Sequence, residues 1–229
     1  MPYELDAEAR RRLEAVLARL AEGPRSLTSV REPQAAWRAH VADSLTGLEV
    51  PELRAARRIA DVGAGAGFPS FPLAVALPEA QVDAIESVGR KCEFIAAAAE
   101  AAGVANVRAV NARSEEWARQ PPPEGGREAY DVVTARAVAR LATLAELASP
   151  LLREGGVLVA WKGRRDPEEE AELGRALGPT AMAAERVLEV GELAGYEHRH
   201  LHVLRKIAPT PANLPRRPGL AKKRPIGAK

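Results

Sequence analysis

Three glycines behind an acidic residue form the part of the chain whose residue types and spacing most clearly indicate chemistry. The segment is Asp61-Val62-Gly63-Ala64-Gly65-Ala66-Gly67, with the spacing G-x-G-x-G instead of the G-x-G-x-x-G of dinucleotide-binding folds. Glycines let the backbone approach a ligand closely, and the unpaired N–H groups at the start of a helix favour electron-rich atoms. The segment therefore predicts a ligand-binding turn between a strand and a helix. The alternative is a tight turn without a ligand.

Two carboxylates lie near this turn in the expected structure. Asp61 precedes the first glycine by two positions, and Glu86 ends the next apolar segment, where it could accept hydrogen bonds from both hydroxyls of a ribose. The Asp61 carboxylate would repel a pyrophosphate but not a cationic sulfonium with its amino-acid tail. The pattern therefore favours S-adenosylmethionine over a nicotinamide dinucleotide. The predicted cofactor-binding residues of this region are Asp61, Gly63, Gly65, Gly67 and Glu86.

Ser114 and Glu115 follow the third expected strand, at the edge of the sheet where the adenine of the cofactor would lie. Their side chains could contact the adenine amino group or its ring nitrogens. They could equally form an ordinary helix start with acidic residues in the first turn. Both interpretations remain open, and they are compatible with each other.

The cofactor turn needs a strand before it and a helix after it, and the surrounding sequence supplies such pairs repeatedly. Short apolar segments alternate with helical ones from residue 58 onward, which is typical of a parallel sheet with helices on both faces. The expected strands are Arg58–Val62, Gln81–Glu86, Asn106–Val110, Asp131–Ala135, Gly156–Trp161, Arg186–Val190 and His198–Leu204. The expected helices are 6–21, Pro33–Leu48, Ser87–Ala102 and Arg136–Leu152.

We therefore expect an α/β protein with a seven-stranded, doubly wound, mostly parallel sheet, which resembles the class I S-adenosylmethionine-dependent methyltransferase fold. The predicted divisions are an N-terminal helical cap (1–50), the α/β methyltransferase domain (51–205) and a basic, proline-rich tail (206–229). Five prolines after residue 206 exclude a regular helix or a central strand, so we expect an extended tail.

The segment at the end of the fourth expected strand bears on which atom receives the methyl group. Class I methyltransferases generally bring substrate and methyl group together there, and this chain has Thr134-Ala135-Arg136-Ala137 instead of the Asn/Asp-Pro-Pro-aromatic segment that holds an exocyclic amine. It also lacks the Pro-Cys nucleophile of pyrimidine carbon methylation, because Cys92 lies elsewhere. A ring nitrogen with an exposed lone pair, such as guanine N7, needs neither device. Catalysis would then depend mostly on proximity and alignment.

Arg136 is the predicted catalytic residue and also a predicted cofactor-binding residue. Its guanidinium could donate to guanine O6, contact a phosphate or hold the cofactor pocket in shape. The competing interpretation is an ordinary ion pair with Glu146 or another acid.

Histidines occur in two further patterns. His198, His200 and His202 alternate along one expected strand, but no fourth ligand is evident, so we expect a polar sheet face and no metal. His40 lies three residues before Asp43 and could either form a capping pair with it or face the active site.

Charge is distributed very unevenly along the chain. The net charge is +2, yet the segment from Arg205 onward carries eight basic residues and no acid, which leaves −6 for residues 1–204. A basic tail on an acidic body favours an RNA partner, although a flexible solvated tail is the alternative. The predicted RNA-binding residues are Arg216, Arg217, Lys222 and Lys223.

Composition excludes several classes of protein. Aromatic residues make up only 4% of the chain, which argues against the base-stacking surfaces of single-strand-binding proteins. The sequence contains no apolar segment of membrane-spanning length, no secretory signal and only one cysteine. We expect a monomeric cytoplasmic protein.

Ordered motifs over most of the chain resemble the RsmG (GidB) family of bacterial 16S rRNA guanine-N7 methyltransferases. These motifs are Leu27-Thr28, His40 with Asp43-Ser44-Leu45, the glycine segment followed by Phe68-Pro69, Glu86-Ser87, Arg113-Ser114-Glu115-Glu116, Thr134-Ala135-Arg136, Lys162-Gly163 and Pro215-Arg216-Arg217-Pro218-Gly219. Ser70 and Leu214 depart from the usual glycine and aromatic residue of the family.

The resemblance implies methylation of N7 of the guanine at nucleotide 527, in the 530 loop of 16S rRNA, with S-adenosylmethionine as cofactor. It adds Phe68 to the predicted cofactor contacts and makes 16S rRNA, the 30S subunit or an assembly intermediate the predicted partner. The alternatives are a class I methyltransferase acting on another RNA site or a small molecule, a nicotinamide-binding oxidoreductase, and a non-catalytic RNA-binding module.

Overall fold

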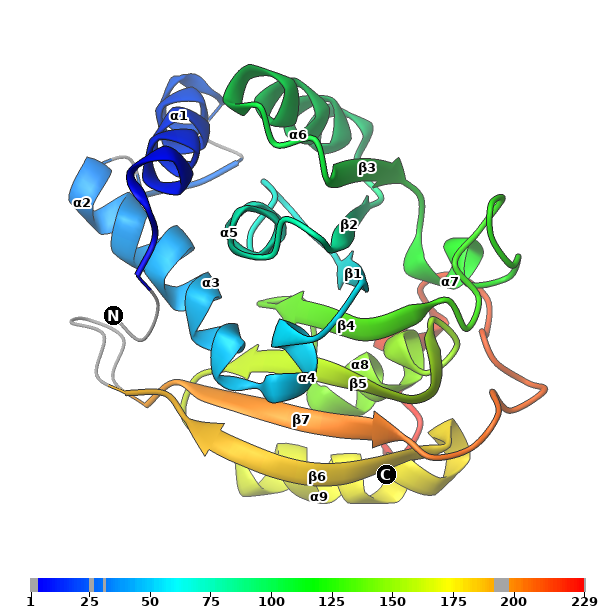
Figure 1. The fold of residues 1–229 in the computed structure, drawn as a ribbon. Coiled ribbons are helices and arrows are strands. Elements are labelled where there is room, and N and C mark those ends of the chain that lie inside the picture. Colours follow the sequence, from blue (N-terminus) through cyan, green and yellow to red (C-terminus); the bar gives the residue numbers. More distant parts are fainter. Residues whose placement is uncertain (1–3, 25–26, 31, 192–197, 229) are drawn as a thin grey trace.

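A single seven-stranded sheet forms the centre of the molecule in the computed structural model, which describes residues 4–24, 27–30, 32–191 and 198–228 (Figure 1). The strands are β1 (Arg58–Val62), β2 (Gln81–Glu86), β3 (Val107–Asn111), β4 (Tyr130–Arg136), β5 (Leu152–Lys162), β6 (Met182–Glu189) and β7 (His200–Lys206). Their order in the sheet is β3-β2-β1-β4-β5-β7-β6. The first five strands are parallel, and β7 runs antiparallel to β5 and β6. The predicted seven-stranded, mostly parallel sheet is confirmed.

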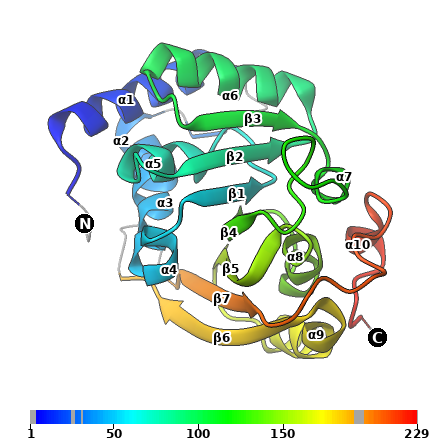
Figure 2. The ribbon, with the colours of Figure 1, turned by 45° about the vertical axis from the view of Figure 1, so that its right-hand side comes forward.

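Helices cover both faces of this sheet, as Figure 2 shows. The helices are α1 (Ala7–Glu22), α2 (Pro33–Ala36), α3 (Asp43–Leu45), α4 (Pro51–Arg54), α5 (Ser70–Ala76), α6 (Gly89–Ala102), α7 (Ser114–Trp117), α8 (Leu141–Ala148), α9 (Pro167–Leu177) and α10 (Leu220–Lys223). A π-helical turn at Trp37–Ala42 and 3₁₀ turns at Thr46–Glu49 and Gly178–Thr180 complete the helical structure of the described residues.

Alternate residues of the strands enter two separate apolar cores, one on each face of the sheet. Ile59 and Val132 pack in the core beneath α1, α5 and α6, whereas Ala60 and Val133 pack in the core beneath α8 and α9. Strands that are buried on both faces must be apolar at most positions. Because β1 and β2 are such short apolar segments, their predicted first and last residues agree with the structure.

The N-terminal helices share a core with the sheet. Four apolar residues at helical spacing, namely Leu13, Val16, Leu17 and Leu20, are buried on α1. They belong to the same apolar core as Ile59 of β1. The expected helix Pro33–Leu48 is present as a run of α2, a π-helical turn, α3 and a 3₁₀ turn. The wider π-helical turn lies at Trp37–Ala42 and contains His40.

Three other expectations need correction. The expected helix at Arg136–Leu152 begins only at Leu141, because β4 continues through Arg136 and Ala137 adopts a left-handed conformation with φ of 59°. Helix α9 was not anticipated, although Asp166 caps it and Pro167 occupies its first turn. The tail is not uniformly extended: it forms turns and the short helix α10, with Leu214 and Ala221 buried against the rest of the protein.

None of the helices in the described part of the chain combines the length and apolar character needed to cross a membrane.

Candidate cofactor pocket and active site

The glycine turn between β1 and α5 has the backbone conformation that its sequence predicts. Gly63, Gly65 and Gly67 have φ values of 70°, 62° and 88°, a region that favours glycine. At Gly67 a Cβ atom would lie 2.3 Å from Cε2 of Phe71, and at Gly63 it would lie 2.9 Å from Cγ2 of Val138. Both glycines are therefore required by packing as well as by conformation.

Glu86 fixes this turn to the end of β2. Its buried carboxylate accepts hydrogen bonds from the N–H of Gly65 at 3.1 Å and from the N–H of Val88 at 2.9 Å. A carboxylate has about four acceptor positions, so Glu86 retains capacity for ligand hydroxyls. Glu86 also lines the cavity described next, which is the position that a ribose-binding carboxylate requires.

A cavity of about 500 Å³ lies at the carboxyl ends of the parallel strands. This is the size of small-molecule and cofactor sites, and it is the edge at which α/β proteins bind ligands. Gly63, Glu86, Ser114 and Glu115 all line it, so the structure brings together four of the predicted cofactor residues. The remaining walls come from the turn after β4 and from the C-terminal segment around α10.

Ser114 and Glu115 lie in the first turn of α7 with their side chains buried at the cavity. Both interpretations of this segment are therefore compatible with the structure, since the residues start a helix and line the site. One oxygen of Glu115 accepts a hydrogen bond from the N–H of Gly219 at 2.7 Å. No sequence spacing indicated this contact between α7 and the tail.

Asp61 lies behind the glycine turn and does not line the cavity. Its carboxylate is 1% exposed and accepts hydrogen bonds from Oγ of Ser70 at 2.6 Å and Oγ1 of Thr134 at 3.1 Å. Burial raises the pKa of Asp61 to about 6, although the two hydroxyls and Arg136 oppose this rise. The predicted cofactor contact of Asp61 is not supported, because the side chain joins α5 to β4. Ser70, the unusual residue after Phe68-Pro69, supplies one of these hydrogen bonds.

Arg136, at the end of β4, is held by the N-terminal helices. Its Nη1 donates to the carbonyl oxygen of Ala39 at 2.6 Å and to Oδ2 of Asp43 at 2.8 Å. Asp43 is fully buried and also forms an ion pair with Arg199 at 2.9 Å. Arg136 therefore does pair with an acid, but with Asp43 and not with Glu146. It does not line the 500 Å³ cavity, so its predicted catalytic and cofactor roles remain a proposal.

His40 lies next to Phe68 instead of pairing with Asp43. The two rings stack with centroids 4.9 Å apart, and Nε2 of His40 lies 3.0 Å from Oγ1 of Thr28. Burial, assisted by the positive charge of Arg136, lowers the pKa of His40 to about 4. His40 is therefore a neutral side chain at pH 7. Of its two interpretations, the capping pair with Asp43 is wrong, and the active-site interpretation remains a proposal.

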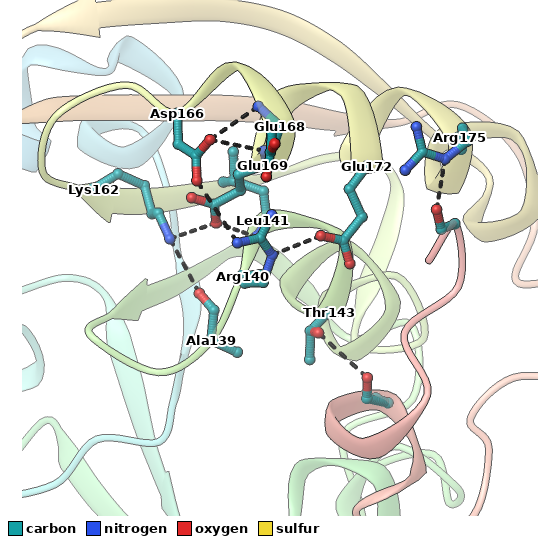
Figure 3. A network of polar contacts seen from close by, with 12 residues as sticks. Ala139, Arg140, Leu141, Thr143, Lys162, Asp166, Glu168, Glu169, Glu172 and Arg175 are labelled. Atoms are coloured by element: carbon teal, nitrogen blue, oxygen red, sulfur yellow. Dashed lines mark hydrogen bonds and ion pairs between the residues drawn. The ribbon is translucent and has the colours of Figure 1, made fainter. Parts of the chain in front are cut away.

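A polar network missed by sequence analysis holds the turn after β4, which contributes Val138 and Ala139 to the cavity (Figure 3). Nζ of Lys162 donates to the carbonyl oxygen of Ala139 at 3.3 Å and to Glu169 at 2.6 Å. Glu169 also accepts a hydrogen bond from the N–H of Leu141 at 2.7 Å and so caps α8. Helix α9 thus helps to position one wall of the cavity, because its Glu169 binds both Lys162 and the start of α8.

The three histidines near β7 do not form one face of a strand. His198 precedes β7 with φ of 68°, and Nδ1 of His200 lies within hydrogen-bonding distance of the carbonyl oxygens of Gly163 and His198, to which it can donate. His202 is buried in the sheet. Within residues 4–24, 27–30, 32–191 and 198–228, the structure contains no group of three or more potential metal ligands.

The four predicted RNA-binding residues have different surroundings. Arg217, Lys222 and Lys223 are exposed, and both lysines border the cavity. The guanidinium of Arg216 instead forms two hydrogen bonds with the buried carboxylate of Glu146, each 2.5 Å long. Arg216 therefore has a structural partner within the chain.

Comparison with known proteins agrees with this architecture. Residues 11–201 match the sequence model of the GidB family, described as rRNA small subunit methyltransferase G. Ribosomal RNA small subunit methyltransferase G of Rubrobacter xylanophilus is 42% identical over 205 residues, covering 88% of this chain and 77% of the relative. The protein of the same name from Deinococcus deserti is 40% identical over 214 residues, covering 93% of this chain and 86% of the relative.

Solved structures show the fold. An O-methyltransferase from Bacillus cereus, in complex with SAH, matches with a TM-score of 0.58 and 17% identity over 89% of this chain and 92% of that one. A fibrillarin pre-rRNA processing protein from Methanococcus jannaschii matches with a TM-score of 0.53 and 17% identity over 69% of this chain and 70% of that one. The predicted class I methyltransferase fold is confirmed, and the chain belongs to the GidB family of rRNA small subunit methyltransferase G proteins.

Proposed function

We propose that the protein transfers a methyl group from S-adenosylmethionine to N7 of a guanine in 16S rRNA, the guanine at nucleotide 527 in the 530 loop. The observation that carries the proposal is the buried Glu86 carboxylate, which joins the glycine turn to the end of β2 while lining the 500 Å³ cavity. Membership of the GidB family supports the same reaction on small-subunit rRNA.

The residues of the cavity suit S-adenosylmethionine, which supplies an electrophilic methyl group when bound. Glu86 would accept hydrogen bonds from the ribose hydroxyls, and Ser114 with Glu115 would lie at the adenine. The carboxylates of Glu86 and Glu115 favour a cationic ligand over a dinucleotide pyrophosphate. Phe68, packed on His40, would border the cofactor from the N-terminal side.

The surroundings of the single cysteine favour a ring nitrogen, and not a pyrimidine carbon, as methyl acceptor. Cys92, the single cysteine of the chain, is buried, and its Sγ donates to the backbone oxygen of Glu86 at 3.1 Å. Burial raises the pKa of this thiol, so it is a poor nucleophile for carbon methylation. Guanine N7 carries a free lone pair and needs no base to remove a proton. Arg136 would then orient the guanine or the cofactor and would not transfer a proton.

The substrate side of the proposal depends on the exposed cations next to the cavity. Arg217, Lys222 and Lys223 would contact RNA phosphates, on a protein whose first 204 residues carry a net charge of −6. We propose that the partner is 16S rRNA, the 30S subunit or an assembly intermediate, and that the enzyme acts as a cytoplasmic monomer.

Calorimetry with the full chain tests the cofactor assignment. We expect S-adenosylmethionine and S-adenosylhomocysteine to bind at one site and NADH not to bind. Glu86→Gln should weaken S-adenosylhomocysteine binding at least about tenfold, because a charged acceptor of the ribose is lost and the turn loses one of its hydrogen bonds. Glu93→Gln changes the same charge at an exposed position of α6 and should retain the affinity of the wild type. Tight NADH binding, or equal affinities of the Glu86 variant and the wild type, would contradict the proposal.

A further inference from the structure

The C-terminal strap, defined here as residues 214–224, forms one wall of the cofactor cavity. Pro218, Gly219, Ala221, Lys222 and Lys223 line this cavity together with Gly63 and Glu86. In Figure 2 the segment with α10 lies beside α8 and near α7. A segment that sequence analysis assigned to RNA alone is therefore also part of the small-molecule site.

Helix α8 holds the strap at two points. The Arg216 guanidinium bonds to both oxygens of Glu146, which is 2% exposed, and to the backbone oxygen of Arg224 at 2.7 Å. Further along, Oγ1 of Thr143 donates to the backbone oxygen of Ala221 at 3.3 Å (Figure 3). A bidentate pair with a buried carboxylate fixes the position of a chain segment far better than an exposed pair does.

The strap also contacts the predicted adenine-binding residues directly. The N–H of Gly219 donates to Oε1 of Glu115 at 2.7 Å, while Oε2 of Glu115 accepts from Oγ of Ser114 at 3.3 Å. Gly219 has φ of 78°, so this turn of the strap requires glycine. The orientation of Glu115 in the cavity thus depends on the strap staying in place.

We propose that Arg216 is a positioning residue of the cofactor site: its ion pair with Glu146 holds the strap against the cavity and thereby completes the pocket for S-adenosylmethionine. This inference rests on the cofactor assignment made above. Arg216 would act on cofactor affinity without touching the cofactor, through Gly219 and Glu115.

Two adjacent arginines provide a matched test. The Arg216 side chain is half-buried and paired with Glu146, whereas the Arg217 side chain is exposed and makes no hydrogen bond or ion pair with another described residue. Replacing either by glutamine removes one positive charge from the same segment. Only the Arg216 variant loses the contact that holds the strap.

The experiment is calorimetric titration of full-length Arg216→Gln and Arg217→Gln with S-adenosylhomocysteine, alongside urea unfolding of each variant. We expect Arg216→Gln to bind about tenfold more weakly than the wild type, and Arg217→Gln to bind within about twofold of it. Equal affinities of the Arg216 variant and the wild type would overturn the inference, as would equal losses in both variants. A wild type that does not bind S-adenosylhomocysteine would instead overturn the cofactor assignment itself.

Arg216→Gln leaves the buried Glu146 carboxylate without its partner and can destabilise the fold. The double variant Glu146→Gln/Arg216→Gln removes both charges and keeps a hydrogen-bonding amide on each side. We expect this folded double variant to show the same loss of cofactor affinity, because the bidentate anchor is absent. If it bound S-adenosylhomocysteine as tightly as the wild type, the strap anchor would have no role in the pocket.

Discussion

The Asp61 carboxylate lies inside the protein behind the glycine turn, held by one hydroxyl group of α5 and one of β4. An acid two positions before a glycine turn indicates a ligand contact, yet its side chain points into the protein, where Ser70 and Thr134 bind it. Thr134 lies opposite Asp61 on the neighbouring strand β4 but 73 positions away in the sequence, so no local spacing predicts this contact. Glu86 was predictable because a residue that ends a parallel strand reaches the ligand edge of the sheet.

The raised pKa of Asp61 makes a prediction for stability against pH. The unfolded carboxyl ionises near 3.8, whereas the buried one ionises near 6, so the folded state loses relative stability as the pH rises from about 4 to about 6. A shift of this size corresponds to about 3 kcal/mol. Asp61→Asn lacks this titration. The free energy of unfolding of the variant, relative to the wild type, should therefore rise by about 2 kcal/mol between pH 4 and pH 7.

Urea unfolding of both proteins at several pH values measures this difference. Other titrating groups, including His40, contribute equally to the pH dependence of both proteins as long as their surroundings are the same, so their contributions cancel in the difference. Parallel stability profiles of the wild type and Asp61→Asn would show that the carboxyl is not desolvated in the folded protein.

At the scale of elements, regular parts of the chain were predictable and their connections were not. The strands β1 and β2 follow from short apolar runs, and α1 follows from its apolar spacing and its end at Gly23. The predicted start of α8 is wrong because Ala137 adopts a left-handed conformation, which an alanine in the sequence does not indicate. The position of the strap could not be predicted from the sequence. Arg216 binds Glu146, which lies 70 positions earlier, and no local sequence pattern indicates this contact.

The glycine turn gives a prediction at this scale. Gly67→Ala should destabilise the fold by about 3 kcal/mol, because it combines a left-handed φ of 88° with a Cβ atom 2.3 Å from Phe71. Gly103→Ala is the matched control: its φ is 64° and its Cβ atom would meet nothing within 4 Å, so about 1 kcal/mol is expected. Urea unfolding measures the free energy of unfolding of both variants. Equal losses of stability would mean that the glycine turn can shift to accommodate the Cβ atom at position 67.

At the scale of the whole molecule, the basic end of the sequence lies at the cavity formed by the carboxyl ends of the strands. The exposed cations of the strap lie beside the cofactor cavity, and α1 lies on the opposite side of the molecule (Figure 2). The net charge of +2 is the sum of −6 for residues 1–204 and +8 for residues 205–229, the segment that supplies these cations. The sequence could predict the basic tail but not that its basic residues border the pocket.

RNA binding should consequently depend on where a cation lies and not only on the total charge. Lys222→Ala/Lys223→Ala should weaken binding to a 16S rRNA fragment and reduce the slope of log K against log salt by about 1 to 2, because two phosphate contacts are lost. Arg11→Ala/Arg19→Ala removes the same charge from the exposed side of α1 and should leave the slope unchanged. Filter binding over a range of salt concentrations measures both, and equal changes in the two variants would indicate a non-specific charge effect.

The methylated atom can be identified in a single experiment. The enzyme is incubated with labelled S-adenosylmethionine and either 16S rRNA or 30S subunits that lack the modification, and the RNA is then cleaved chemically at 7-methylguanosine. We predict incorporation of one methyl group and cleavage at nucleotide 527. Label on an adenine, a cytosine or an exocyclic nitrogen, without cleavage at that guanine, would contradict the proposed reaction.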